Sequence, residues 1–390
     1  MTEKLFYVDS HLKEFTAVVE LCRPRDDRYE VVLDRTAFFP EGGGQYADTG
    51  RLGDVLVSDA RERDGLIYHL TDGPLPVGAE VEGRIDWGTR FMKMQQHTGE
   101  HIVSGLVHAR LGYNNVGFHL GSGDCTMDFD GEITREVLME IEQAANEAAV
   151  SNLEVLVSYP AESELAGLEY RSKIEIEGQV RIVTIPGYDV CACCAPHVKR
   201  TGEIGMIKLT NVQRYKGGAR VTMLCGYRAL ADYRTKEEQT RQISSLLCAR
   251  ENRVADAVVH LKEEHTQQKA RLAQMQKILL KYKAQEIPKT EQFVCLFEEE
   301  MEGDGPRILM NLILENGRAA CVVFQKTGVE SFRYVMGSRT VDMRPLAREF
   351  HGQFGGRGGG KPEMVQGSAQ GSKDEMRAWM QKKGKEILNV

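Results

Sequence analysis

The pattern of hydrophobic and polar residues changes several times along the chain, which predicts several structural regions. In the first 90 residues, short runs rich in valine and isoleucine alternate with turn residues, as in YEVVLDR, VLVSDA and VEGRID. Short strands at this spacing are typical of a small barrel or sandwich. We therefore expect residues 1–90 to form a β-rich, barrel-like domain.

The pattern becomes helical after residue 90. No proline interrupts residues 90–111, and apolar residues recur at spacings of three and four over residues 132–151. Strand-like runs follow at LEVLVSY and QVRIVTI. This alternation predicts an α+β domain over residues 91–226.

Residues 227–287 contain neither glycine nor proline. Their apolar residues form a stripe at spacings of three and four, with some polar interruptions, which predicts a long helix or helical hairpin with coiled-coil character. A continuous helix of this length would extend roughly 90 Å at 1.5 Å per residue. Pro288 ends this spacer. Residues 288–390 are predicted to form an α/β domain with strands at FVCLF and AACVVF, a glycine-rich loop and an amphipathic terminal helix.

The composition narrows the class of protein. With 42% hydrophobic and 27% charged residues, the chain resembles ordinary globular proteins. No apolar run approaches the ~18 residues of a membrane span, and no secretory signal is visible, so we expect a cytoplasmic protein with no membrane partner. The net charge of −7 argues against a generally basic, nucleic-acid-coating protein but allows local basic patches. Nine cysteines do not suggest a disulfide framework.

One group of histidines and cysteines has the spacing of metal ligands. His97 and His101 are four residues apart in HTGEH, so on a helix both project from one face. Cys193 and His197 are four apart in CCAPH, where Pro196 favours a turn. Three nitrogens and one sulfur suit tetrahedral Zn²⁺. Spacing alone favours structural and catalytic zinc equally.

HTGEH also fits the H-x-x-E-H pattern of inverted zinc peptidases. In that hypothesis Glu100 is the general base, and Glu175 or Glu177 supplies a downstream ligand. Cys193 and His197 then have no role, which makes the peptidase the weaker interpretation.

A glycine-rich segment near the C-terminus offers a second kind of site. Residues 355–361 fit G-x-x-x-x-G-K, but Pro362 replaces the Ser or Thr that would hold Mg²⁺, so a nucleotide-hydrolysing loop is not expected. Backbone amides of this loop, with Arg357 and Lys361, are instead candidates for contacts with RNA phosphate. The lysines of the terminal helix add basic character that would suit RNA contact, and a solvated helix surface is the competing explanation for them.

Several separated motifs resemble one known family. HTGEH after Gln96, then GFHLG, then CCAPH followed by VKRTGEIG, resemble the editing domain of alanyl-tRNA synthetase and its freestanding AlaX relatives. FFPEGGGQYADTG and QRYKGGARV fit the same family, and GGRGGGKPEMVQG resembles the DHH-associated domain that closes alanyl-tRNA synthetase. The motifs agree in order over most of the chain, which is similar to a long-form AlaX protein.

The resemblance implies an ATP-independent trans-editing hydrolase that cleaves the aminoacyl ester of tRNA(Ala) mischarged with serine or glycine. It implies one Zn²⁺ per chain, and a homodimer formed through the helical spacer and the C-terminal domain, which also contacts tRNA. Glu100 and His119 are the candidate catalytic residues, although a solvated helix residue is the competing explanation for Glu100. The implied zinc ligands are His97, His101, Cys193 and His197, and the implied substrate contacts are Gly42, Gly43, Gly44 and Gln45.

Two further thiols depart from the family pattern. Cys191 is a candidate substitute ligand and Cys194 a candidate packing residue, and thiols so close to the site predict sensitivity to oxidation. Two alternatives to the editing hydrolase stay open: a non-catalytic tRNA-binding or dimerisation protein with structural zinc, and the zinc peptidase.

Overall fold

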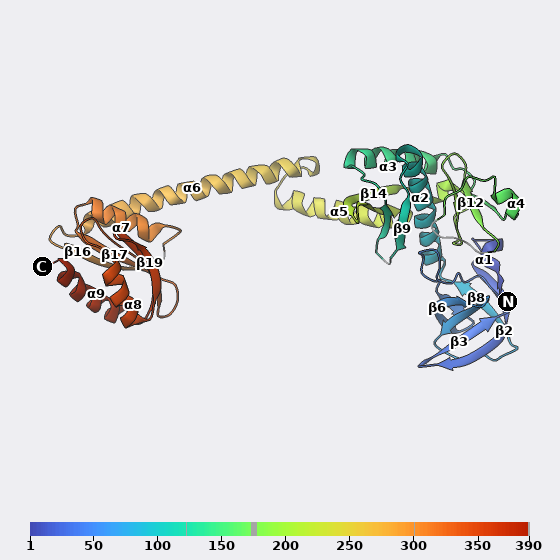
Figure 1. Cartoon of the computed structure of the whole chain (residues 1–390), viewed down its shortest axis with the longest axis horizontal. Coiled ribbons are helices and arrows are strands. Elements are labelled where there is room, and N and C mark those ends of the chain that lie inside the picture. Colours follow the sequence, from blue (N-terminus) through green and yellow to red (C-terminus); the bar gives the residue numbers. More distant parts are fainter. Residues whose placement is uncertain (122, 173–177, 300, 389–390) are drawn as a thin grey trace. The chain divides into compact units, whose positions relative to one another are not determined.

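The computed structural model describes residues 1–121, 123–172, 178–299 and 301–388 (Figure 1). The chain divides into two compact units, Met1–Gln242 and Ile243–Val390. Each unit is considered by itself below. The finer division into four domains stays a prediction. No helix in the described ranges is long and apolar enough to cross a lipid bilayer.

The N-terminal β-rich region contains a closed barrel with the strand order β2-β3-β7-β6-β5-β8. Apolar side chains such as Phe15, Leu33 and Ile67 fill its interior. A short parallel pair, β1 and β4, joins the first residues of the chain to the barrel. The bounds are β1 (Glu3–Lys4), α1 (Leu5–Val8), β2 (Glu14–Arg25), β3 (Arg28–Leu33), β4 (Arg35–Thr36), β5 (Gly50–Leu52), β6 (Val55–Arg63), β7 (Leu66–Thr71) and β8 (Glu80–Ile85).

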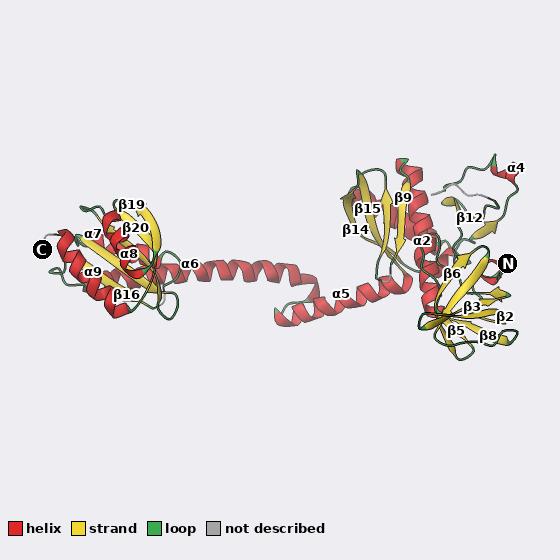
Figure 2. Cartoon of the chain, turned by 60° about the horizontal axis from the view of Figure 1, so that its bottom comes forward, coloured by secondary structure: helices red, strands yellow, loops and turns green. Residues whose placement is uncertain are grey.

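The rest of the first unit is a mixed α and β fold. Two helices, α2 and α3, share a core with the antiparallel sheet β14-β15-β10-β9, and a smaller sheet has the order β11-β12-β13 (Figure 2). The bounds are α2 (Trp87–Leu111), β9 (Asn115–Leu120), β10 (Cys125–Phe129), α3 (Arg135–Val150), β11 (Leu156–Ser158), α4 (Glu162–Leu165), β12 (Ile182–Ile185), β13 (Asp189–Ala192), a 3₁₀ turn (Thr201–Ile204), β14 (Ile207–Tyr215) and β15 (Gly218–Cys225). The helices predicted over residues 90–111 and 132–151 are thus confirmed.

Helix α2 is the central element of this unit. It begins at Asp86, whose side chain accepts a hydrogen bond from Thr89 N at 3.2 Å, and it ends at Gly112 in the left-handed conformation with φ 73°. All residues from Lys93 to Val107 are buried. Several of them are polar or ionisable, and buried groups of this kind need partners. Helix α2 therefore carries a buried polar site.

An ion pair inside the protein fixes the glycine-rich loop of residues 42–48 against α2. Arg90 is fully buried and donates from Nε to Asp48 Oδ2 at 2.7 Å. Lys93, also fully buried, donates to the Ala47 carbonyl at 2.6 Å. Because Asp48 in turn accepts from Phe39 N at 2.8 Å, the barrel, the loop and α2 are joined in one network.

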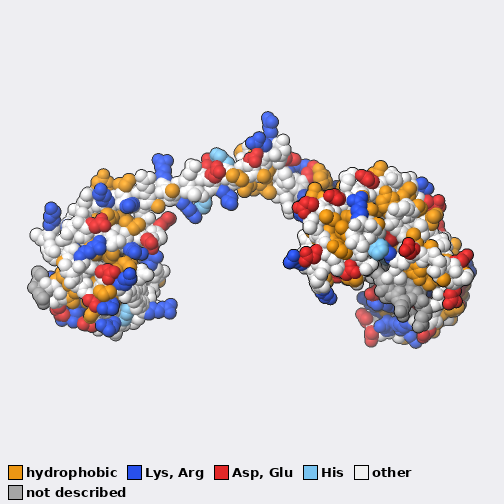
Figure 3. Space-filling view, turned by 45° about the horizontal axis from the view of Figure 1, so that its top comes forward, with side chains coloured by type: hydrophobic (Ala, Val, Ile, Leu, Met, Phe, Trp, Pro, Cys, Tyr) orange, Lys and Arg blue, Asp and Glu red, His pale blue; other side chains and the backbone are white. Residues whose placement is uncertain are grey.

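The spacer is not one continuous helix. It consists of α5 (Gly226–Leu246), a 3₁₀ turn (Glu251–Arg253) and α6 (Val254–Glu286). Between them Cys248 adopts a left-handed conformation with φ 49°, and Ala249 N donates to the Ser244 carbonyl at 3.0 Å. This six-to-one hydrogen bond is a helix-ending motif that glycine usually forms, and no glycine or proline marks the position here. Helix α6 exposes apolar residues between charged ones (Figure 3).

The second unit contains a five-stranded sheet of order β16-β17-β18-β20-β19. Separate apolar clusters cover it, one with α7 and the end of α6, the other with α8 and α9. The bounds are β16 (Phe293–Glu298), α7 (Gly305–Glu315), β17 (Ala320–Lys326), β18 (Ser331–Ser338), α8 (Arg344–Phe354), β19 (Arg357–Lys361), β20 (Met364–Gln370) and α9 (Lys373–Leu388).

The glycine-rich segment near the C-terminus is an edge strand, which corrects the predicted loop. Residues of β19 pair with β20 from Arg357 opposite Ser368 to Lys361 opposite Met364. Glycine is needed because a Cβ on Gly358 would lie 2.3 Å from the Gln366 carbonyl oxygen. The segment thus has no phosphate-binding loop between a strand and a helix.

Candidate metal centre and its cavity

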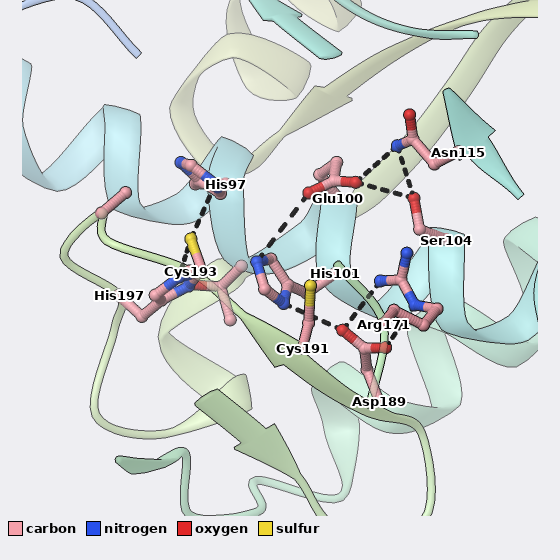
Figure 4. Close-up of polar contacts among 12 residues, drawn as sticks. His97, Glu100, His101, Ser104, Asn115, Arg171, Asp189, Cys191, Cys193 and His197 are labelled. Carbon is pink, nitrogen blue, oxygen red and sulfur yellow. Dashed lines mark hydrogen bonds and ion pairs between the residues drawn. The ribbon is translucent and has the colours of Figure 1, made fainter. Parts of the chain in front are cut away.

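The four predicted metal ligands lie together. His97 and His101 project from α2, and Cys193 and His197 lie in the segment after β13 (Figure 4). Their donor atoms all lie within 4.8 Å of one another. Cys193 Sγ is 3.5 Å from both His97 Nε2 and His197 Nε2. Bonds of ~2.3 Å to sulfur and ~2.05 Å to nitrogen at a tetrahedral angle would separate such atoms by about 3.5 Å, so the donor set fits zinc.

Each of the three imidazoles is held through its other nitrogen. The hydrogen-bond partner is a side-chain oxygen in every case, which leaves Nε2 to face the metal position, the usual arrangement around a bound metal. The pairs are His97 Nδ1 with Gln45 Oε1 at 3.1 Å, His101 Nδ1 with Asp189 Oδ2 at 2.9 Å, and His197 Nδ1 with Thr98 Oγ1 at 3.1 Å.

The carboxylate that orients His101 belongs to a buried ion pair. Arg171 donates from Nε and Nη2 to the two oxygens of Asp189, at 2.7 and 2.9 Å. Burial raises the pKa of Asp189, but the hydrogen bonds from His101 and Arg171 outweigh it and lower the pKa overall. Asp189 is therefore ionised. Sequence analysis missed both residues, because Arg171 is 18 residues from Asp189 and no motif links them.

The electrostatics favour the metal-binding forms of Cys193 and His197, whereas the pKa of His101, which burial lowers, is raised overall by its hydrogen bonds to Asp189 and Cys193. Burial raises the pKa of Cys193, but the charge of His97 and hydrogen bonds from His101, His197 and His97 lower it well below its ordinary value. The thiolate is thus the favoured form. Burial lowers the pKa of His197 to about 3, so its imidazole is neutral. Thiolate and neutral imidazole are the forms that ligate zinc.

Glu100 is buried, so the alternative explanation that it is a solvated helix residue is wrong. Its side chain is 1% exposed and accepts hydrogen bonds from Ser104 Oγ at 2.7 Å and Asn115 Nδ2 at 2.6 Å. Its other oxygen lies 3.9 Å from His101 Nε2. A catalytic role for Glu100 stays a prediction. The ligands Glu175 and Glu177, which the peptidase hypothesis needs, lie outside the described residues.

A cavity of about 770 Å³ opens beside the metal position. Gly43 and Gly44 form part of its wall, with Phe118 and Cys194. Gly44 must be glycine, because its φ is 79° and a Cβ would lie 2.8 Å from Phe118. Gln45 lies behind this wall, 1% exposed, and its Nε2 has no hydrogen-bond partner among the described residues.

The other predicted residues lie in different surroundings. His119 is exposed on β9, where Phe118, its neighbour in the alternating strand, lines the cavity, so the placement of His119 does not favour a catalytic role. Cys191 is buried and forms a second group of possible metal ligands with His101 and Asp189. In the second unit, Arg357 and Lys361 are exposed at the two ends of β19.

Three family models match separate parts of the chain. The model described as "tRNA synthetases class II (A)" matches residues 9–89, "Threonyl and Alanyl tRNA synthetase second additional domain" matches residues 180–224, and "DHHA1 domain" matches residues 290–386. The second contains Cys193 and His197, and the third covers the sheet of the second unit.

Proteins similar to this chain match it over different lengths. The alanyl-tRNA editing protein AlaX-L of Pyrococcus horikoshii is 28% identical, with 96% of each chain covered. The alanine–tRNA ligase of Pyrobaculum neutrophilum is 30% identical over 95% of this chain, which spans 43% of that ligase. The alanyl-tRNA editing protein Aarsd1 of Rattus norvegicus is 30% identical over 63% of this chain and 64% of its own. The chain thus carries matches to these three domains in this order and is similar over almost its whole length to a freestanding alanyl-tRNA editing protein.

Proposed function

We propose that the protein is a zinc-dependent hydrolase that removes serine or glycine from mischarged tRNA(Ala). The observation that carries this proposal is the group of four donor atoms, with every imidazole oriented by an oxygen partner, beside a cavity that admits a ligand. Similarity over almost the whole chain to an alanyl-tRNA editing protein supports the substrate. Each chain would hold one Zn²⁺ through His97, His101, Cys193 and His197.

The residues around the centre suggest how the ester is positioned. A bound zinc supplies a Lewis acid that polarises a carbonyl or binds water. Asp189 and Gln45 hold two of the imidazoles in place, and Phe118 packs against His97 with 4.8 Å between ring centroids. The unpartnered Nε2 of Gln45 is a donor that the hydroxyl or carbonyl of the amino acid could satisfy. A hydrogen-bonding site of this kind selects serine over alanine better than an apolar pocket does.

The second unit is proposed to serve tRNA contact and dimerisation. Arg357 and Lys361 are exposed and available to phosphates. Several apolar residues of α6 are more than half exposed, including Leu272 and Leu279, and a second copy would cover them. Sedimentation velocity of the full chain tests this, because a monomer at micromolar concentration would contradict the proposed homodimer.

The central experiment measures deacylation of Ser-tRNA(Ala), Gly-tRNA(Ala) and Ala-tRNA(Ala). We expect the wild type to release serine or glycine while sparing alanine, and the Cys193→Ala variant to lose both zinc and activity. Cys248→Ala is the matched control, because Cys248 is an exposed thiol in the other unit. Survival of all three esters with folded, zinc-loaded protein would favour structural zinc in an RNA-binding protein. Peptide cleavage that Glu100→Gln abolishes and Cys193→Ala leaves intact would favour the peptidase.

A further inference from the structure

Two of the four candidate metal ligands lie in a segment without regular structure. Cys193 and His197 follow β13, and no helix or strand includes residues 193–197. Buried backbone groups in such a segment need partners from elsewhere in the fold. At its far end Thr98 supplies them, because Thr98 Oγ1 lies 3.1 Å from His197 Nδ1 and accepts from Val198 N at 3.3 Å. The near end, which carries Cys193, needs an anchor of its own.

Arg181 is the anchor at the near end. Its Nη1 donates to the backbone carbonyls of Cys193 and Ala195, at 2.7 and 3.0 Å, and its own carbonyl accepts from Cys193 N at 3.0 Å. Three hydrogen bonds from one residue therefore hold the turn that presents Cys193 Sγ. Since this sulfur is 3.5 Å from Nε2 of both His97 and His197, a small change in the turn alters the spacing of the donor atoms.

Arg181 also joins the metal-binding segment to the barrel. The residue is 8% exposed, and its guanidinium lies 5.2 Å from the centre of the Tyr7 ring on helix α1. Ala195, whose carbonyl it holds, is fully buried in the apolar core of the barrel. Because Arg181 and Ala195 are both buried, removal of the guanidinium would leave the two carbonyls without this donor in a place that water does not reach easily.

The burial of this guanidinium is costly. Within the described ranges no carboxylate pairs with Arg181, and its Nε is buried without a hydrogen-bond partner. A buried cation without a counter-charge is normally unfavourable, and an apolar side chain of similar volume would often be more stable. An apolar side chain, however, has no donor for the carbonyls of the metal-binding segment. The cost is therefore explained if the segment needs a fixed shape.

We propose that Arg181 is the positioning residue for Cys193 and holds its turn in the metal-binding shape before the metal arrives. The inference rests on the proposed function, because it takes His97, His101, Cys193 and His197 as the zinc ligands. Donor atoms that are already in place lose less conformational freedom when the metal binds, so the affinity for the metal is higher. Arg181 contacts the backbone of a ligand residue, which no spacing of ligand motifs reveals.

Competition with a chromophoric chelator measures the zinc affinity of the full-length protein and its variants. We expect Arg181→Met to bind zinc about 10- to 100-fold more weakly than the wild type, the usual effect of losing a group that supports a ligand. The matched control is Arg318→Met in the other unit. Arg318 is 5% exposed, donates to the backbone carbonyls of Asn316 and Ile287, and likewise has a buried Nε without a partner among the described residues. This control should lose stability but bind zinc like the wild type.

Cobalt substitution tests the geometry of the site. Co²⁺ bound to a thiolate and imidazoles gives charge-transfer and ligand-field bands whose positions depend on the angles between the donor atoms. We expect Arg181→Met to shift or weaken these bands, and Arg181→Lys to restore them in part, because lysine keeps the charge and a donor but not the planar fork. If the zinc affinity and cobalt bands of Arg181→Met equal those of Arg318→Met, the positioning role is refuted.

A second pair of variants covers the case in which Arg181→Met does not fold. Arg181→Lys and Arg318→Lys are then compared, with weaker zinc binding expected in the first alone, and equal affinities would again overturn the proposal. These measurements need no catalysis, so the two proposals fail separately. A wild type that binds zinc but deacylates no tRNA would refute editing and leave the Arg181 comparison intact. Deacylation by the wild type with unchanged zinc affinity in Arg181→Met would refute the positioning role alone.

Discussion

Replacing Gly105 by alanine should damage the metal centre from a distance. Gly105 faces the segment that leads into β13, and a Cβ there would lie 2.1 Å from the Tyr188 carbonyl oxygen and 3.0 Å from Asp189 Cβ. Ordinary van der Waals contact begins at 3.4 Å, so the helix and the segment must separate by roughly 1 Å. A shift of that size breaks the 2.9 Å hydrogen bond between Asp189 and His101.

Two energies follow from this displacement. Overpacking costs typically about 1–3 kcal/mol, against a gain of about 1 kcal/mol from the helix propensity of alanine, so the net loss of folding free energy should be about 0–2 kcal/mol. Loss of the carboxylate partner should weaken zinc binding about 10- to 100-fold. Zinc affinity is thus the more sensitive measurement, and competition with a chromophoric chelator gives it directly.

The control is Gly88→Ala on the same helix. Gly88 is exposed, and a Cβ there would meet only an Asp86 oxygen at an ordinary 3.6 Å. This variant should keep wild-type zinc affinity and gain up to about 1 kcal/mol of stability. If Gly105→Ala binds zinc as tightly as Gly88→Ala, the reasoning from close packing to metal geometry is wrong.

Three further predictions concern other parts of the chain. Burial lowers the pKa of His69 to about 4 in the folded protein, whereas an unfolded histidine has a pKa of about 6.5. Below pH 6.5 the unfolded chain therefore binds the extra proton, and the free energy of unfolding falls with the pH. The expected loss at pH 4.5 is about 2–3 kcal/mol. Urea unfolding at pH 7.5 and 4.5 should show this fall in the wild type and a smaller one in His69→Leu; equal falls would contradict it. If Glu100 acts as general base, Glu100→Gln should lower kcat about 10²- to 10⁴-fold at full zinc content, whereas a change in KM alone would argue against that role. Arg357→Ala and Lys361→Ala should each weaken tRNA binding and reduce the slope of log affinity against log salt by about 1, which filter binding measures; an unchanged slope would exclude a phosphate contact.

The structure brings the four predicted ligands together, and local geometry explains the placement within each pair. Two histidines four apart need only a helix to share a face, and α2 provides it. Cys193 and His197 need only a turn, which Pro196 favours. That the two pairs meet depends on the tertiary fold; the donor types suggested this meeting, and the resemblance to a known family implied it.

The partners of the ligands were beyond prediction from spacing. Gln45 was expected to touch the substrate, but its contact with a ligand, Oε1 at 3.1 Å from His97 Nδ1, had no signal in the spacing. Asp189 and Arg171 gave no signal, although a carboxylate four residues before Cys193 is a position worth inspecting in similar sequences. The competing explanation of Glu100 as a solvated residue was wrong: a glutamate on a helix is usually solvated, but the packing of β9 against α2 buries this one and supplies Asn115 as its donor.

The break in the spacer shows the same limit for backbone structure. A left-handed position is normally occupied by glycine or asparagine, which makes it visible in a sequence, but here Cys248 takes that conformation. The hydrogen bond from Ser244 Oγ to the Ala249 carbonyl adds local support for this turn that the residue pattern does not indicate.

The network of Arg90, Asp48 and Lys93 bears on how the protein can be dissected or recombined. Since the loop between β4 and β5 supplies Asp48, Gln45 and a wall of the cavity, the barrel region belongs with the candidate metal centre and is not an appendage to it. A cut between residues 89 and 90 would separate Arg90 from its counter-charge Asp48 and His97 from the amide of Gln45 that orients it. The smallest piece suited to transplantation into another chain is therefore the whole of residues 1–242. Exchanges of barrels between homologues should succeed only when the loop of residues 42–48 and helix α2 are exchanged with the barrel.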